Sequence, residues 1–337
     1  MPSIKVLSKE ETEKILNMRD VISVVESAYA QKAAKEATIF DWVFHEFDPG
    51  VADMDIKSGW LQDAGVYGMK LVSWFSKNRD KKLPEIMGVI MVFDDQTGMP
   101  IGLVDGAHIT GMRTGAAGAI GAKYLAKKNA KTLLMVGTGH ISTFEIAATL
   151  LAVESITQVL IHNPRTPENA IELAAEIKTI LKNRFDIDKE FSVKAEPDLE
   201  FAVKNAQIII TATPAREAMI KKEWVQPGTH FSCIGADMPG KEEIDPRIFE
   251  NARVFVDDLQ QCMNIGEIEI PIKTGFLKSE SIVGEIGDVI NQSAVGRTNN
   301  DEITVFDATG TALLDLMTAQ LAFRIAGEYG LGTDVIL

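Results

Sequence analysis

The chain has 337 residues, of which 46% are hydrophobic and 24% charged, the composition of a folded globular protein long enough for two domains. Its 34 basic and 48 acidic residues give a net charge of −14, which argues against nucleic-acid partners and anionic membranes. No apolar run reaches the roughly 20 residues that span a bilayer, and no signal-peptide pattern precedes the first charged residues, so we expect a cytoplasmic protein.

The first half of the chain predicts a helix, a sheet and a second helix. Apolar residues at helical spacing predict one surface helix in the first thirty-odd residues; they are Ile15, Met18, Val21, Ile22, Val25 and Tyr29. Between Phe40 and Val104, short apolar runs separated by turn residues predict a mixed or antiparallel sheet. The small residues of "HITGMRTGAAGAIGAKYLA" then predict a helix that packs closely against another element.

The second half alternates apolar strands with helices. The expected strands are "TLLMVGTG", "QVLIHNP", "AQIIITATP", "THFSCIGAD" and "ARVFVDD", with a helix between the last two. Near-continuous apolar strands separated by helices are typical of a parallel sheet covered on both faces, so an α/β doubly wound domain is predicted. After "TVFDATG", a final amphipathic helix is expected to return to the first domain.

The segment "VGTGHIS" has the pattern of a phosphate-binding turn between a strand and a helix. Gly137 and Gly139 allow a sharp turn and close approach to a phosphate, and the following helix start offers free backbone N–H groups. Ser142 stands where a third glycine is usual and is small enough for the same close packing. We therefore predict a Rossmann-type dinucleotide site; its expected contacts are Gly137, Thr138, Gly139, His140 and Ile141.

The end of the second strand bears on the choice between NAD and NADP. Asn163 lies 24 residues after Gly139, near the roughly 20-residue interval at which NAD enzymes place an acid on the ribose. The segment "LIHNPRTPE" offers Asn163, Arg165 and Thr166 instead, a cation and hydrogen-bond donors that suit a 2′-phosphate. We therefore expect NADP in preference to NAD, although Arg165 could also be a solvated loop residue.

Six motifs in chain order resemble those of the ornithine cyclodeaminase/mu-crystallin family: "GMKLVSWFSKN", "FDDQTGMPIGLVDGAHITGMRTGAAGAIGAKYLA", "VGTGHIS", "IGADMPGKEEID", "GEIGDVI" and "TVFDATGTALLD". The resemblance implies a homodimer in which a Rossmann-type domain is inserted into a mixed α+β domain that binds the small-molecule substrate and dimerises. On this basis we assign residues 1–127 and 307–337 to the substrate-binding domain and 128–306 to the dinucleotide-binding domain. No metal site is expected.

The resemblance also implies roles for three charged residues. Lys70 in "MKLV" is expected to neutralise a substrate carboxylate or polarise the reacting nitrogen. Arg113 in "GMRTG" suits bidentate contact with a substrate carboxylate or a cofactor phosphate, and Thr114 beside it is expected to contact the cofactor. Asp237 in "GADMPGK" follows an apolar strand and could accept or hold a proton, although a helix N-cap is the alternative.

Two threonines at the end of another strand complete the expected cofactor contacts. Thr211 and Thr213 of "TATP" should lie at the carboxyl edge of the parallel sheet, where doubly wound folds bind ligands. We therefore expect both to line the nicotinamide pocket.

One position departs from the family pattern. Members usually carry a carboxylate-binding arginine about 24–28 residues before the "MKLV" lysine, but "WVFHE" contains none. His45 and Lys57 are the candidate replacements. The nearby acids Glu46, Asp48, Asp53 and Asp55 indicate either an amine-bearing substrate or a solvated acidic face.

The implied activity is nicotinamide-dependent chemistry at the carbon–nitrogen bond of an amino or imino acid. The reaction most like that of ornithine cyclodeaminase abstracts a hydride, closes a ring, releases ammonia and returns the hydride. Alternatives are an alanine-type dehydrogenase or a ketimine reductase, in which cofactor is consumed. A non-catalytic, crystallin-like protein that binds the cofactor is an alternative of another class.

Overall fold

The computed structural model describes residues 3–336, and the chain divides into two compact units. One unit comprises Met1–Arg113 and Thr311–Leu337, and the other comprises Thr114–Gly310. The sequence placed these boundaries at 127/128 and 306/307. The first change of unit lies inside helix α3 (Gly106–Leu125), so a single helix contributes residues to both units. Residues 1, 2 and 337 of the expected first domain lie outside the described part.

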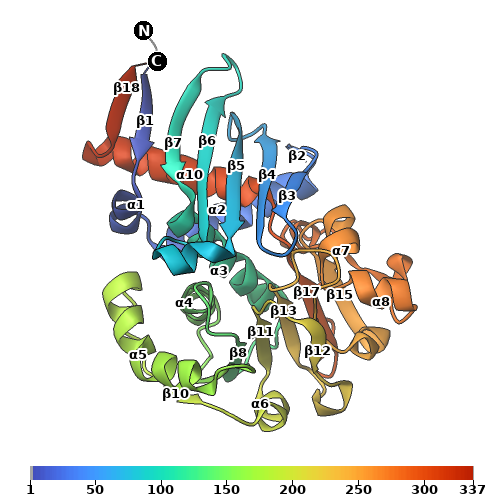
Figure 1. The fold of residues 1–337 in the computed structure, drawn as a ribbon. Helices are drawn as coiled ribbons and strands as arrows, with labels where there is room; N and C mark the ends of the chain where they lie inside the picture. Colours follow the sequence, from blue (N-terminus) through green and yellow to red (C-terminus); the bar gives the residue numbers. More distant parts are fainter. Residues whose placement is uncertain (1–2, 337) are drawn as a thin grey trace. The chain divides into compact units, whose positions relative to one another are not determined.

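The first unit is built on an eight-stranded mixed sheet (Figure 1). Its strand order is β18-β1-β7-β6-β5-β4-β2, with β3 paired to β4. Strand β1 is parallel to β7, whereas the neighbours from β7 to β2 are antiparallel, as expected for residues 40–104. The strands are β1 (Ser3–Leu7), β2 (Ala37–Ile39), β3 (Val43–Asp48), β4 (Ala52–Leu61), β5 (Val66–Phe75), β6 (Ile86–Asp94), β7 (Pro100–Asp105) and β18 (Thr333–Ile336), with the 3₁₀ helix η1 (Ser76–Lys81) after β5.

The N-terminal segment differs from the single helix that the spacing predicted. Strand β1 comes first, and two helices, α1 (Lys9–Ile15) and α2 (Met18–Ala33), follow. Asn17 separates them, because its side chain accepts a hydrogen bond from the Asp20 amide at 2.9 Å and so caps a new helix. The apolar stripe from Met18 to Tyr29 is buried along α2, as its period indicated.

The C-terminal helix α10 (Ala312–Tyr329) crosses the sheet of the first unit (Figure 1). Glycines on the strands make room for it: a Cβ on Gly68 would lie 2.8 Å from Leu316 Cδ2, and one on Gly102 would lie 2.4 Å from Phe323 Cε1. The helix is buried on nearly all sides rather than amphipathic, since it packs against both the sheet and α2.

The second unit contains the doubly wound parallel sheet that the sequence predicted (Figure 1). Its order is β10-β9-β8-β11-β13-β17-β15-β16, and every neighbouring pair is parallel. Strands β8, β9 and β10 run outward in one direction, and β11 and β13 continue from β8 in the other, with β17 inserted between β13 and β15. The switch point therefore lies between β8 and β11. The strands are β8 (Thr132–Val136), β9 (Gln158–His162), β10 (Ser192–Ala195), β11 (Ile208–Thr211), β13 (His230–Cys233), β15 (Ala252–Val256), β16 (Gly284–Glu285) and β17 (Ile303–Asp307), beside a small parallel pair, β12 (Arg216–Ile220) and β14 (Glu242–Ile244).

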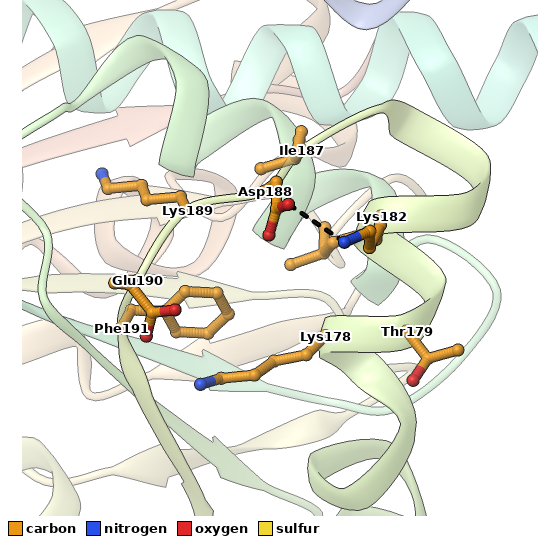
Figure 2. A pocket seen from close by; sticks show the side chains of 9 residues that line it. Lys178, Thr179, Lys182, Ile187, Asp188, Lys189, Glu190 and Phe191 are labelled. Carbon is orange, nitrogen blue, oxygen red and sulfur yellow. Dashed lines mark hydrogen bonds and ion pairs between the residues drawn. The ribbon is translucent and has the colours of Figure 1, made fainter.

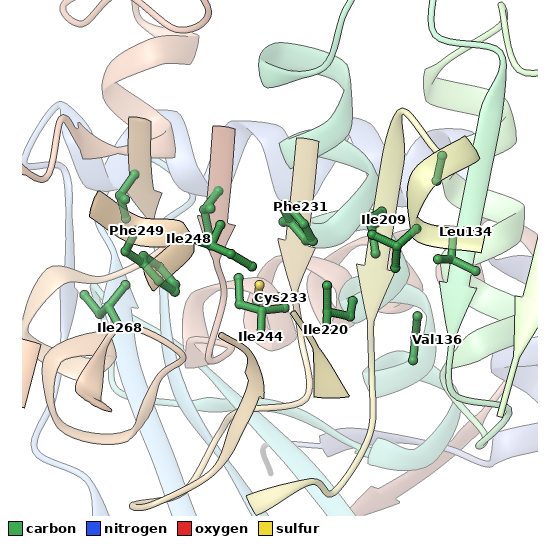
Figure 3. Close-up of a cluster of buried hydrophobic side chains, with 14 of the residues drawn as sticks. Leu134, Val136, Ile209, Ile220, Phe231, Cys233, Ile244, Ile248, Phe249 and Ile268 are labelled. Carbon is green, nitrogen blue, oxygen red and sulfur yellow. The ribbon is translucent and has the colours of Figure 1, made fainter. Parts of the chain in front are cut away.

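Apolar side chains from neighbouring strands form the core on one face of this sheet (Figure 3). Leu134, Ile209, Phe231 and Val305 come from four adjacent strands and are fully buried. The helices of the unit are α4 (Ser142–Ala152), α5 (Pro167–Phe185), α6 (Leu199–Asn205), α7 (Leu259–Ile265), α8 (Glu269–Thr274) and α9 (Ile286–Ile290), with 3₁₀ helices η2 (Lys222–Trp224), η3 (Pro246–Asn251) and η4 (Ser279–Ser281). Within residues 3–336, no helix is both long and apolar enough to cross a membrane.

One expected helix is absent from its place. Between "THFSCIGAD" and "ARVFVDD" the chain makes a turn, the short strand β14 and the 3₁₀ helix η3. Pro239-Gly240 turns the chain, with Gly240 at φ +74°. Asp245 then accepts a hydrogen bond from the Arg247 amide and starts η3 at Pro246. The intervening segment is therefore too short for an α-helix.

Candidate active site

A buried cluster of three charged side chains lies within the first unit. Lys70 Nζ is 3.0 Å from Asp315 Oδ2, and Arg113 Nε is 3.0 Å from Asp315 Oδ1. Lys70 projects from β5, Arg113 from α3 and Asp315 from α10, and their side chains are at most 8% exposed. The expected residues Lys70 and Arg113 are therefore brought together by a carboxylate that the sequence analysis did not single out.

Burial sets the protonation of this cluster. It lowers the pKa of Lys70 to about 8; the Arg113 guanidinium also lowers it, and the Asp315 carboxylate opposes both. Burial disfavours the charge of Asp315 as well, but Arg113 and Lys70 hold the pKa of that carboxyl below its usual value. Two cations thus share one carboxylate, which leaves a net positive charge when Lys70 is protonated.

Strand register distinguishes the two candidate replacements for the missing arginine. Lys57 on β4 is directly opposite Lys70 on β5, so both side chains lie on the same face of the sheet. His45 on β3 is opposite Met54, which is an odd number of residues from Lys57 and therefore lies on the other face. The structure thus groups Lys57, and not His45, with Lys70.

The neighbouring acids fall into two environments. Glu46 and Asp48 are exposed, and Asp48 forms an ion pair of 3.3 Å with Lys77. Asp53 and Asp55 are half-buried on β4 and lie at even spacing from Lys57, so they share its face. Glu46 and Asp48 therefore belong to a solvated acidic face. Asp53 and Asp55 lie on the sheet face that carries the buried cluster.

The glycine turn of the second unit has the expected strand–turn–helix geometry. Gly137 follows β8 with φ +110°, and a Cβ there would lie 2.5 Å from the Ala212 carbonyl oxygen. Around Gly139, by contrast, a Cβ would meet no atom of the protein within 4 Å. Ser142 begins α4, is buried, and donates its hydroxyl to the Gly139 carbonyl at 2.7 Å. A small residue at this third position therefore fits.

Residues after β9 form a turn beside the glycines. Asn163 donates its amide to Thr138 Oγ1 at 2.7 Å and accepts hydrogen bonds from the backbone N–H groups of Arg165 and Thr166, both at 2.9 Å. The Arg165 side chain is exposed, and no acid stands at this strand end. His140 is exposed too, with its ring 5.1 Å from that of Phe144.

The two threonines at the end of β11 are buried, and Thr213 has a defined partner. Glu243 Oε1 accepts hydrogen bonds from Thr213 N at 2.8 Å and from Thr213 Oγ1 at 2.7 Å. Thr211 is fully buried at the register position between Val136 and Cys233. Both threonines therefore lie at the carboxyl edge of the sheet, and the hydroxyl of Thr213 is engaged by a carboxylate.

Asp237 lies four residues beyond Cys233, the last residue of β13, in a segment without regular secondary structure and not at a helix N-cap. Its side chain is 50% exposed and accepts a hydrogen bond from Lys241 Nζ at 2.5 Å. Lys241 is itself mostly buried and also donates to the Gly235 carbonyl. The Lys241 ammonium thus binds the carboxylate of Asp237, the residue that the motif predicts to accept a proton.

Sequence reasoning missed the buried acids of both units, among them Asp315, Glu243, Glu267 and Asp307. Burial, opposed by the hydrogen bond from the Ile268 amide and assisted by the nearby Asp257, raises the pKa of Asp307 to about 8. The available signal was the acid itself inside an apolar run, as in "ALLDLM" and "TVFDATG". That signal marks a buried acid but does not say which residues it meets.

A cavity of about 180 Å³ lies elsewhere in the second unit, between α5 and the segment that leads to β10 (Figure 2). Lys182 and Asp188, which form an ion pair of 3.0 Å, are among the residues that line it. None of the expected site residues lines this cavity. Among the described residues, no group of three His, Cys, Asp or Glu side chains could hold a metal ion.

Similarity to known proteins agrees with these observations. The model of the ornithine cyclodeaminase/mu-crystallin family matches residues 3–326. The alanine dehydrogenase of Archaeoglobus fulgidus is 34% identical over 330 residues, which cover 98% of this chain and 97% of that protein.

Two solved structures share the fold over essentially their whole length. An archaeal alanine dehydrogenase dimer with bound NAD has a TM-score of 0.90 at 32% identity, with all of both chains covered. The Δ1-pyrroline-2-carboxylate reductase of Thermococcus litoralis, in complex with NADH and L-proline, has a TM-score of 0.91 at 31% identity, with 98% of this chain and 100% of the other covered. As its six motifs predicted, the chain belongs to the ornithine cyclodeaminase/mu-crystallin family.

Proposed function

We propose that this protein is a nicotinamide-dependent oxidoreductase that acts on the carbon–nitrogen bond of a small amino or imino acid. The observation that carries this proposal is the buried cluster of Lys70, Arg113 and Asp315, in which two cations share one carboxylate. The excess positive charge suits the carboxylate of an amino or imino acid, and the Arg113 fork suits its two oxygens. Lys57, on the same face as Lys70, supplies a further cation in place of the family arginine.

The glycine turn supports a dinucleotide as the cofactor. Gly139 is not required by contacts inside the protein, since a Cβ would meet nothing within 4 Å, whereas close approach of a phosphate does require it. The turn also lies at the switch point between β8 and β11 and precedes the 11-residue helix α4. When bound, the nicotinamide supplies the hydride acceptor or donor.

Within this cofactor class we propose NADP(H) as the preferred form. The end of β9 carries no acid that would bind a ribose 2′-hydroxyl or repel a 2′-phosphate. Arg165 lies there instead, exposed and next to a turn that Asn163 fixes. The solved relatives contain NAD or NADH, so direct comparison of the two nucleotides is the test.

Side chains of the protein bind the substrate and transfer protons. Lys70 and Arg113 hold the substrate carboxylate, and Lys70, with a pKa of about 8, can also exchange a proton near neutral pH. Asp237 accepts the proton that leaves the substrate nitrogen, with Lys241 holding its carboxylate in place. Relatives of 31–34% identity are a dehydrogenase and a reductase, which favours net oxidation or reduction over cyclodeamination.

An apolar face of the first unit supports a homodimer. Met69, Leu71, Met87 and Val89 on β5 and β6 are 37–51% exposed. Their register puts Leu71 opposite Val89 and away from the face of Lys70, so they form one continuous surface. Exposed apolar surfaces of this kind mark protein interfaces. Sedimentation velocity of the wild type and of Leu71→Lys tests this: the variant should sediment as a monomer, and an unchanged dimer would refute the assignment.

A substrate panel tests the reaction. The purified protein is incubated with amino acids, cyclic imines, and 2-oxo acids plus ammonia, with each nicotinamide nucleotide, while NAD(P)H absorbance and ammonia are followed together. A net change in NAD(P)H is expected, whereas ammonia release without it identifies a cyclodeaminase. Nucleotide binding without turnover of any compound would favour the crystallin-like alternative. Asp237→Asn should lose turnover and keep nucleotide affinity.

A further inference from the structure

A buried carboxylate, Glu243, joins two loops at the carboxyl edge of the parallel sheet. It projects from β14, is fully buried, and accepts hydrogen bonds through both of its oxygens. Oε1 accepts from Thr213 N and Oγ1, at 2.8 and 2.7 Å, and Oε2 accepts from Gly235 N at 2.9 Å. Because Thr213 follows β11 and Gly235 follows β13, one side chain ties together the ends of two adjacent strands.

The same segments pack against the glycine turn. A Cβ on Gly235 would lie 2.4 Å from the Thr213 carbonyl oxygen and 2.6 Å from Glu243 Cδ. These groups therefore pack so close to Gly235 that no side chain fits at this position. A Cβ on Gly137 would lie 2.5 Å from the Ala212 carbonyl oxygen and 3.2 Å from Thr213 Cγ2. The ends of β8, β11 and β13 are thus packed in a line, and Glu243 holds the last two of them.

A second buried acid, Glu267, makes a different set of contacts. Its Oε1 accepts hydrogen bonds from Glu243 N and Ile244 N, both at 2.7 Å, whereas Oε2 has no hydrogen-bond partner among the described residues. Burial raises the pKa of Glu267 well above its usual value, and the neighbouring Glu243 raises it further. Burial raises the pKa of Glu243 as well, but hydrogen bonds from Thr213 and Gly235 oppose this rise, and both of its oxygens act as acceptors for them.

We propose that Glu243 is a positioning residue for the nicotinamide dinucleotide, because it fixes the segments after β11 and β13 against Gly137 of the phosphate-binding turn. The inference rests on the proposed function only in taking this edge of the sheet as the cofactor site. Glu243 contacts the protein backbone and Thr213, and acts on the cofactor through them.

Two isosteric substitutions separate this role from a general need for buried acids. Glu243→Gln replaces one acceptor oxygen by an NH₂ group, which must then face an N–H donor of Thr213 or Gly235. Glu267→Gln is the matched control: its amide oxygen can still accept from Glu243 N and Ile244 N, and its NH₂ takes the place of the unpartnered Oε2. Both variants lose a buried carboxyl, but only Glu243→Gln loses an oxygen that accepts a hydrogen bond.

The readout is NADH and NADPH affinity, measured by nucleotide fluorescence on the full-length protein without substrate. Glu243→Gln should bind the preferred nucleotide about tenfold more weakly, while Glu267→Gln stays within about twofold of wild type, with thermal unfolding confirming that both are folded. Equal affinities for the two folded variants would overturn the inference. If Glu243→Gln does not fold, Thr213→Val, which removes one donor to Glu243, should weaken binding about threefold.

The outcome for wild type separates this inference from the proposed function. Wild-type protein that binds neither nucleotide would reject the cofactor assignment and, with it, the role of Glu243. Wild-type binding combined with unchanged affinity in Thr213→Val and Glu243→Gln would reject the role of Glu243 alone.

Discussion

Replacing Asp315 with Asn tests how far the buried cluster depends on one carboxylate. The substitution keeps the shape of the side chain but removes the charge that lies 3.0 Å from both Lys70 Nζ and Arg113 Nε. Both cations would remain buried without a counter-ion, which costs about 3–5 kcal/mol of folding free energy when one partner of a buried ion pair is removed. We therefore expect a large loss of stability although the substitution hardly changes the size of the side chain.

The same substitution should change the protonation of Lys70. Burial and Arg113 lower the pKa of Lys70 and Asp315 raises it, and the balance of these effects is a pKa of about 8. Without Asp315 this pKa falls further, so less of the lysine is protonated at neutral pH. The KM of Asp315→Asn for an amino or imino acid should therefore rise at pH 7 to 8 and recover as the pH is lowered.

Urea unfolding monitored by tryptophan fluorescence measures the first effect. Trp42, Trp60 and Trp74 lie in the first unit, so the signal reports mainly on the unit that contains Asp315. The matched control is Asp334→Asn, which removes an ion pair of the same 3.0 Å length with Lys5. The Asp334 side chain is 67% exposed, so its loss should cost less than about 1 kcal/mol. Equal losses in the two variants, or a KM profile of Asp315→Asn that matches wild type, would refute the reasoning.

Four further predictions concern the glycine turn, Arg165 and Lys70. Gly137→Ala should weaken nucleotide binding and lower thermal stability by about 1–3 kcal/mol, since φ is +110° and the Ala212 carbonyl is 2.5 Å from the new methyl group. Gly139→Ala should weaken binding while leaving the melting temperature unchanged, because the protein offers no clash; a melting temperature lowered as far as in Gly137→Ala would contradict this. Arg165→Ala should raise the Kd for NADPH about tenfold and leave that for NADH unchanged, as measured by fluorescence titration; equal effects on both would remove the argument for NADP. The substrate KM should rise as the pH passes about 8, where the buried Lys70 ammonium loses its proton, and this rise should be absent in Lys70→Arg.

Local patterns account for the elements that the sequence predicted correctly. The closely spaced small residues of α3 predicted tight packing, and a Cβ on Gly115 would indeed lie 2.5 Å from the Phe144 carbonyl oxygen. The glycine turn between strand and helix was also predictable from the sequence, because Gly137 acts through its backbone geometry and Ser142 through its small size. The N-terminal helix was misjudged because one apolar period continues across Asn17, whose capping bond begins a new helix. The helix expected after Asp237 failed because turn residues outweighed its helical composition.

The sequence by itself determined the family, the parallel sheet with its glycine turn, and the identity of the cations Lys70 and Arg113. Only the tertiary structure decided that Asp315 joins these two cations, that Lys57 rather than His45 shares their face, and that Glu243 binds the ends of two strands. The physical reason is the range of the interactions. Turns, capping bonds and apolar periods act within a few residues, whereas Lys70 and Asp315 are 245 positions apart and meet only because α10 packs across the sheet.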